Sequence, residues 1–195
     1  MEKKIYLQKI GDLNHLILKK LQTDLKQELK EFIDSVEILP NNFPLDNSDF
    51  RVKRNQYYGT SLLKKFELHI KNKNYPNTLG VLNRDIFSLN KSNEPTRYVF
   101  GIARKIINSD STRVALISII RLKEDFYKRR RKKRKERKRI LKEAVHELGH
   151  TFSLKHCKDY CVMQYSNSLA EADEKPAKFC QTCSEKLKNS IENLS

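Results

Sequence analysis

Residues 143–163 read EAVHELGHTFSLKHCKDYCVM and combine a His-Glu-x-x-His pair with a third histidine and two cysteines. His146 and His150 are four residues apart, so on a helix both imidazoles lie on one face, within reach of one metal ion. Glu147 stands beside the first histidine, where its carboxylate can hold and deprotonate a metal-bound water. Apolar residues recur at helical spacing on another face: Leu141, Val145, Leu148 and Phe152. The stretch therefore predicts a helix with separate metal and core faces.

His156 is the third candidate ligand, six residues after His150. A straight helix would not return it to the ion, so we expect the helix to end and the chain to turn back near Gly149 and Ser153. Three histidines and one water make a four-coordinate zinc with an open position, which is the arrangement of a catalytic site. A His-Glu-x-x-His string also occurs in helices whose side chains only face water. The third histidine and the cysteines that follow it favour metal binding.

Four cysteines form two closely spaced pairs, Cys157 with Cys161 and Cys180 with Cys183. These spacings are typical of structural zinc sites, in which four thiolates leave no open position. Two disulfides or four free thiols are the alternatives, and disulfides are rare in a reducing compartment. The sequence thus predicts two zinc ions per chain, one catalytic and one structural. Because Cys157 directly follows His156, we expect loss of the cysteine site to degrade the catalytic site.

Apolar patterning over the rest of the chain predicts strands that alternate with helices. The expected strands are residues 5–10, 36–39, 78–87, 98–103 and 114–120, and the expected helices are residues 13–33, 61–70, 124–152 and 184–194, with a loop over 41–49. This alternation predicts an α/β (α+β) layer followed by a metal-stapled C-terminal segment. We expect one domain over residues 1–195, with the sheet and its helices in 1–140 and the active-site helix and cysteine segment in 141–195.

The composition is that of a polar, soluble chain, with 38% hydrophobic and 33% charged residues among 195. No run of eighteen apolar residues occurs, so no membrane span is expected. The N-terminus lacks the apolar stretch of a signal peptide. We therefore expect a cytoplasmic monomer with no membrane partner.

The net charge of +16 is concentrated in one segment. Residues 128–139 hold eleven basic residues and one acidic residue, Glu136, so this run contributes +10 and the rest of the chain +6. Such a run can bind nucleic-acid phosphates, attract acidic peptides, or simply be a solvated helix or loop. No aromatic residue falls inside it to stack on bases. We interpret it as a solvated or non-specific electrostatic segment, with nucleic-acid binding as the lesser alternative.

Together these motifs resemble those of the archaemetzincins, a branch of the metzincin metallopeptidases. The resemblance is carried by His146-Glu147-Leu148-Gly149-His150, His156-Cys157, Cys161-Val162-Met163 and Cys180-x-x-Cys183, and also by residues 166–173 between the cysteine pairs. Similarity in the N-terminal half is weaker and lies at residues 54–57, 80–85 and 98–101. It implies a metzincin-like fold: a twisted mixed sheet, an active-site helix and a compact C-terminal part. It also implies a Met-turn that places Met163 beneath the imidazoles, and an edge strand near residues 98–101 that pairs with an extended peptide.

Two positions depart from the family's pattern. Ser153 stands where metzincins usually have glycine, and a serine in the same left-handed turn costs about 1 kcal/mol or more. The first cysteine pair has one intervening residue fewer than the pattern, so we expect a tighter loop there. Neither departure removes a ligand.

The sequence therefore predicts a zinc-dependent peptidase that acts on peptides or proteins. Zinc polarises the scissile carbonyl, and Glu147 activates the zinc-bound water and passes the proton to the leaving amine. The alternative is a non-catalytic zinc-binding protein that uses its basic segment to bind nucleic acid or an acidic partner.

Overall fold

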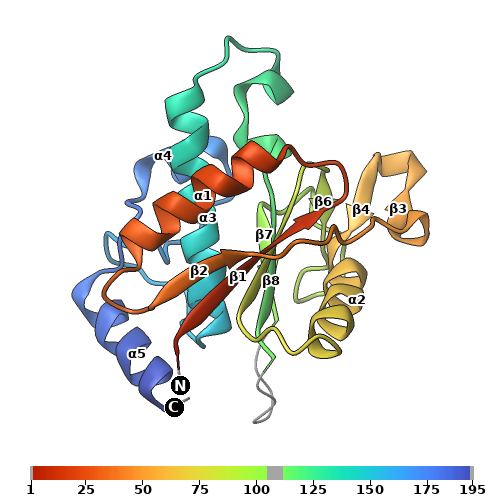
Figure 1. The fold of residues 1–195 in the computed structure, drawn as a ribbon. Helices are drawn as coiled ribbons and strands as arrows, with labels where there is room; N and C mark the ends of the chain where they lie inside the picture. Colours follow the sequence, from red (N-terminus) through yellow and green to blue (C-terminus); the bar gives the residue numbers. More distant parts are fainter. Residues whose placement is uncertain (1, 105–111, 194–195) are drawn as a thin grey trace.

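The larger sheet of the protein has five strands in the order β2-β1-β5-β8-β7 (Figure 1). The structure is a computed structural model that describes residues 2–104 and 112–193. The first four strands in this order run parallel: β2 (Ser35–Ile38), β1 (Lys4–Ile10), β5 (Thr78–Leu82) and β8 (Val114–Ser118). β7 (Gly101–Ala103) lies at one edge, antiparallel to β8. The predicted α/β class is confirmed.

Helices cover both faces of this sheet, as parallel strands that are buried on both sides require. Every residue of β5 and β8 is buried. α1 (His15–Glu28) and α3 (Lys133–Thr151) share a hydrophobic cluster with one face, and α2 (Gly59–Lys71) shares a second cluster with the other (Figure 1). None of the helices in the described part of the chain combines the length and apolar character that a bilayer span needs.

A smaller sheet begins where the predicted strand 78–87 breaks. That segment is two strands, β5 and β6 (Ile86–Phe87), and β6 belongs to a three-stranded sheet with β4 (Gln56–Tyr58) and β3 (Phe50–Arg51). The polar turn between them ends in Asp85, whose carboxylate accepts hydrogen bonds of 2.7 and 2.6 Å from Arg121 and one of 2.9 Å from Gln56. These bonds stabilise the turn, so the expectation of one strand was wrong.

Local charge and capping explain the other differences from the predicted elements. The predicted helix 124–152 is a 3₁₀ turn, η4 (Glu124–Tyr127), followed by α3 from Lys133, because Lys128 adopts a left-handed φ of 55° between them. α4 (Leu169–Glu174) is too short to show a helical period, but Ser168 and Glu171 form a capping box at its start. α5 (Gln181–Glu192) matches the last predicted helix, whose expected end at residue 194 lies outside the described residues. Three further 3₁₀ turns are η1 (Asn47–Asp49), η2 (Val52–Arg54) and η3 (Ile120–Leu122).

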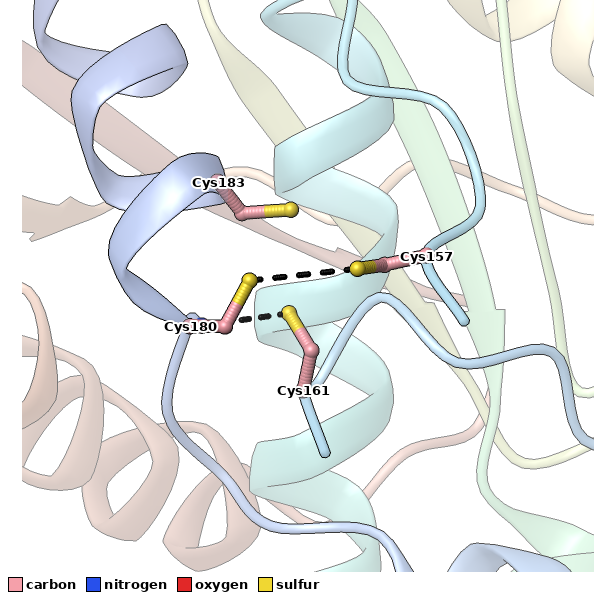
Figure 2. Close-up of side chains that lie close together, drawn as sticks. All are labelled: Cys157, Cys161, Cys180 and Cys183. Atoms are coloured by element: carbon pink, nitrogen blue, oxygen red, sulfur yellow. Dashed lines mark hydrogen bonds between the residues drawn. The ribbon is translucent and has the colours of Figure 1, made fainter. Parts of the chain in front are cut away.

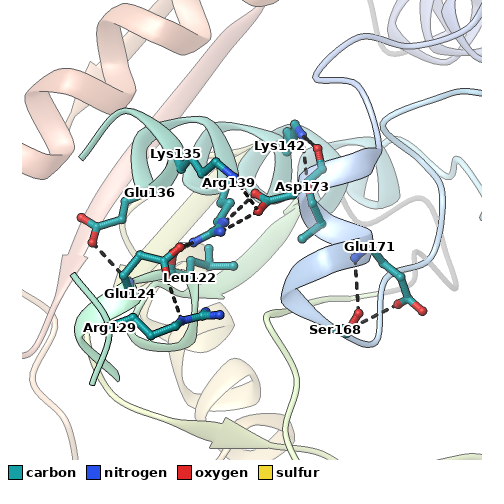
Figure 3. A network of polar contacts seen from close by, with 11 residues as sticks. Leu122, Glu124, Arg129, Lys135, Glu136, Arg139, Lys142, Ser168, Glu171 and Asp173 are labelled. Atoms are coloured by element: carbon teal, nitrogen blue, oxygen red, sulfur yellow. Dashed lines mark hydrogen bonds and ion pairs between the residues drawn. The ribbon is translucent and has the colours of Figure 1, made fainter. Parts of the chain in front are cut away.

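A buried arginine in α3 joins three parts of the chain (Figure 3). Arg139 is 3% exposed, and its guanidinium pairs with Glu124 of η4 at 2.9 Å and with both carboxylate oxygens of Asp173 of α4 at 2.6 Å. One turn later, Lys142 donates to the carbonyls of Ala172 and Asp173 at 3.0 and 2.7 Å. Arg139, the last residue of the basic run, is therefore buried and structural. The composition of the run had predicted a solvated side chain at this position.

Arg139→Met is expected to lower the free energy of unfolding by about 3–5 kcal/mol, because it removes the buried cation that pairs with both Glu124 and Asp173. The matched variant Arg137→Met removes an ion pair with Asp24 from a side chain that is 50% exposed, and should cost about 1 kcal/mol or less. Denaturant unfolding of the two metal-loaded variants measures both effects. Equal losses would show that Arg139 does not hold η4 and α4 to α3.

Candidate metal centre and active site

The three predicted histidine ligands converge on one point. Nε2 of His150 lies 3.1 Å from Nε2 of His146 and 3.2 Å from Nε2 of His156. Three nitrogens at about 2.05 Å from a tetrahedral zinc ion lie about 3.3 Å apart, so the spacing fits three ligands of one ion. His146 is buried, His150 is half-buried and His156 is exposed, so the centre is open to solvent on the side of His156.

Backbone carbonyls select the tautomer of two of these imidazoles. Nδ1 of His146 lies 2.8 Å from the carbonyl oxygen of Val162, and Nδ1 of His150 lies 2.8 Å from that of Leu154. A carbonyl oxygen only accepts, so both Nδ1 atoms carry the proton and both Nε2 atoms present a lone pair to the common point. Burial, together with the nearby Lys175, lowers the pKa of His146 well below its ordinary value, which favours the neutral, metal-binding form.

The chain returns to the metal centre through a Schellman turn at the end of α3. The N–H of Ser153 donates to the carbonyl of His150 at 3.0 Å, and the N–H of Leu154 donates to that of Gly149 at 3.0 Å. Ser153 has a φ of 65°, so the left-handed turn is retained with serine in place of the glycine that suits it. The strain of about 1 kcal/mol stays in the protein, and the position of His156 is preserved.

Glu147 lies between the histidines and the edge strand β7. A Cβ atom on Gly101 would lie 2.5 Å from Cγ of Glu147 and 2.6 Å from its Oε1, so the missing side chain of Gly101 makes the space for this carboxylate. The other oxygen, Oε2, is buried and has no hydrogen-bond partner among the described residues. A buried carboxylate oxygen without a partner, on the residue that follows a predicted ligand, fits a site built for a metal ion and a water molecule.

A second buried carboxylate and a buried lysine lie behind Glu147. Glu143, one turn earlier on α3, is 3.7 Å from Nζ of Lys175, which is only 3% exposed and also donates to the carbonyl of Gln164 at 3.4 Å. Burial and the neighbouring Glu143 raise the pKa of Glu147 well above its ordinary value. Lys175 supplies the positive charge that balances these two carboxylates.

The four cysteine sulfurs form a second cluster and point toward a common centre (Figure 2). Sγ of Cys157 lies 3.8 Å from Sγ of Cys180. Four sulfurs at about 2.3 Å from a tetrahedral zinc lie about 3.8 Å apart, whereas a disulfide would bring two of them to about 2.05 Å. All four cysteines are free thiols. The geometry therefore fits a four-thiolate metal site, and the shorter first loop still closes it.

The segment that begins with Cys161 contacts both clusters. Cys161 contributes a sulfur to the thiol cluster, and the carbonyl of Val162 fixes His146. The carbonyl of Met163 accepts a hydrogen bond from the N–H of Cys157 at 3.0 Å. The Met163 side chain packs on Gly149, where an added Cβ atom would lie 2.5 Å from the methionine Sδ. Met163 therefore packs against α3 at Gly149, and its place in a Met-turn beneath the imidazoles stays a prediction.

The comparisons with known proteins agree with this geometry. The sequence profile described as Peptidase family M54 matches residues 9–189. The chain belongs to this peptidase family. It is 34% identical over 185 residues to an archaemetzincin of Sulfolobus acidocaldarius, an alignment that covers 94% of this chain and 96% of the relative. The predicted membership of the archaemetzincins is confirmed, and the protein is a zinc metallopeptidase.

Solved structures of the family show the same fold. The archaemetzincin of Archaeoglobus fulgidus, crystallised with malonate, is 31% identical, with a TM-score of 0.73 over 94% of this chain and 99% of that one. A zinc-dependent peptidase from Methanocorpusculum labreanum is 25% identical, with a TM-score of 0.78 over 94% and 99% of the two chains. The predicted metzincin-like architecture is therefore confirmed, while the roles of the individual site residues stay predictions.

Three contributors to the archaemetzincin site were missed by the sequence reasoning. The space left by the missing side chain of Gly101 accommodates Glu147, and the carbonyl of Val162 binds His146. Each pair is far apart in the sequence, and no pattern near Gly101 or Val162 indicates the partner. Lys175 is one of forty basic residues, and only the fold distinguishes it as buried. A lysine that directly follows a short capped helix is the weak local signal that was available.

Gly101→Ala is expected to lower kcat/KM by about 100-fold or more, because the new methyl group displaces the Glu147 carboxylate by about an ångström. Zinc content should not change, since no ligand moves. The control Gly59→Ala adds the same methyl group at the start of α2, where it lies 3.1 Å from the carbonyl of Phe87 and far along the chain from the site. Equal activities of the two variants would contradict the proposed packing.

Replacing all four cysteines with serine is expected to weaken zinc binding at the histidines by about 10- to 100-fold, because the segment that orients His146 and His156 loses its anchor. Competition with a chelator, followed by elemental analysis, measures this affinity. The control Lys158→Ser changes an exposed residue inside the same loop. Unchanged affinity in the four-serine protein would show that the two sites are independent.

Proposed function

We propose that this chain hydrolyses peptide bonds with Glu147 as its general base. The observation that supports this role is a buried carboxylate oxygen, unpartnered within the described chain, beside three converging histidine nitrogens. A general base must lie within hydrogen-bonding reach of the water that it deprotonates, and the position of Glu147 directly after His146 supports this role.

His146, His150 and His156 would hold the zinc ion, which when bound supplies Lewis-acid activation of water and of the scissile carbonyl. Glu147 accepts the proton of the attacking water and then delivers it to the leaving amine nitrogen. Glu143, one turn away on α3, pairs with Lys175, and the gap at Gly101 gives the Glu147 carboxylate room.

The proposed substrate is an extended peptide or an unfolded segment of a protein. β7 pairs with β8 on one side and has no strand partner on the other within the described sheet. Such an edge accepts an extended peptide through backbone hydrogen bonds. Because Gly101 of β7 touches Glu147, a peptide paired with this strand would pass directly beside the general base.

The cysteine cluster is proposed to hold the second of two zinc ions per chain, in a structural role. Its sulfur spacing fits a closed tetrahedral site with no position for water. Free thiols grouped in this way persist in a reducing compartment, which supports a cytoplasmic location.

Zinc content and Glu147→Gln test the proposal together. The wild type should carry two zinc ions and the His146→Ala/His150→Ala double variant one. Glu147→Gln should keep both ions and lose about 10²- to 10⁴-fold in kcat on a quenched fluorescent peptide library. Glu174→Gln, an exposed position on α4, is the matched control. Full activity in Glu147→Gln would exclude the general-base role, and no activity in the wild type would favour a non-catalytic zinc protein.

A further inference from the structure

The fold divides the cations of the basic run into two groups. Five of the eleven are paired with carboxylates: Arg129, Arg131, Lys135, Arg137 and Arg139. The other six have no acidic partner within residues 2–104 and 112–193, and all six are exposed: Lys128, Arg130, Lys132, Lys133, Arg134 and Lys138. The unpaired group keeps its whole charge available to an external partner.

Five of the six unpaired cations, all except Lys138, lie at the end of α3 that is farthest from the histidine cluster. The loop before α3 and the first turns of the helix form the uppermost part of the protein in Figure 1. Thirteen residues separate Lys133 from His146, which corresponds to about 20 Å along a helix. A partner bound at this tip would leave the histidine side of the helix accessible.

Internal ion pairs hold the tip in a defined shape. Arg131 pairs with Glu136 at 3.1 Å, and Arg129 pairs with Glu124, the same carboxylate that binds the buried Arg139 (Figure 3). Glu124 and Glu136 are themselves buried. Repulsion among the unpaired cations is therefore opposed by buried carboxylates, and the loop presents its charges from a fixed framework.

The composition of the tip argues against a protein interface. No apolar residue occurs between positions 128 and 139, whereas the cores of protein interfaces are apolar and depleted in lysine. The two aromatic residues before the run are engaged internally, since Arg121 lies 4.5 Å from the ring of Phe126 and Arg129 lies 4.7 Å from that of Tyr127. Phe126 is still 38% exposed, but an arginine covers one face of each ring.

We propose that residues 128–138 form a basic tip that binds the phosphate backbone of nucleic acid without sequence preference. Exposed lysines and arginines in a run that contains no apolar residue suit a polymer of regularly spaced phosphates, which they neutralise with release of condensed counterions. The proposal is independent of the peptidase function, because the tip contains none of the residues of the metal centre.

Fluorescence anisotropy of the zinc-loaded protein with a labelled 20-base-pair duplex at several salt concentrations tests the proposal. The variant Arg130→Gln/Lys132→Gln/Lys133→Gln/Arg134→Gln should reduce the slope of log K against log salt by about 3 to 4, and should weaken binding by at least about tenfold. Zinc content and the hydrolysis of a small peptide should not change in this variant.

The matched control removes the same amount of charge elsewhere. It replaces four exposed lysines that lie outside the tip, Lys53, Lys64, Lys73 and Lys186, with glutamine. This control should retain the wild-type slope and affinity. Equal weakening of both variants would mean that only the net charge matters and would overturn the proposal. So would an absence of binding at 50 mM salt, or binding to anionic phosphatidylserine vesicles but not to the duplex.

Discussion

The hydrogen bond between Nδ1 of His146 and the carbonyl of Val162 is the constraint that links the histidine cluster to the segment of the cysteine cluster. It fixes the buried imidazole of His146 to the segment 161–163. In that segment, Cys161 contributes a thiol to the cysteine cluster and Met163 packs against α3. A backbone carbonyl can serve as this partner only if its segment is itself held in place. Here the thiol cluster and the N–H of Cys157 hold it.

α3 carries the rest of the arrangement because its successive turns have different partners. Its first turns bear unpaired cations, its middle turn holds η4 and α4 through Arg139, and its last two turns carry the proposed general base and two of the predicted ligands. A helix is stiff over this length, so the buried pairs in the middle turn also set the position of the histidines. The buried ionic contacts act here as a positional device rather than as a net source of stability.

Local spacing was sufficient to predict the histidine and cysteine clusters, since a helix fixes residues four apart and a short loop fixes each cysteine pair. The buried strands β5 and β8 also follow from continuous apolar runs. The contact of Gly101 with Glu147 spans 46 positions, which no local pattern reports. The basic composition around Arg139 predicted a solvated side chain, but Arg139 is buried. Its partners, Glu124 and Asp173, are brought to it only by the folded chain. At Ser153 the chain adopts a left-handed turn, although serine disfavours that conformation. The turn that returns His156 to the other two histidines is kept in spite of this local preference.

The 3.8 Å separation of the Cys157 and Cys180 sulfurs has a consequence for chemical durability. If the thiolates lost their ion to an oxidant, closing a disulfide would draw these two sulfurs together by nearly 2 Å. Cys157 is bonded to His156 through a single peptide unit, so the contraction would pull the imidazole away from its neighbours. Oxidative damage to the enzyme would then begin at sulfur atoms that take no part in hydrolysis, and a reductant would be needed to reverse it.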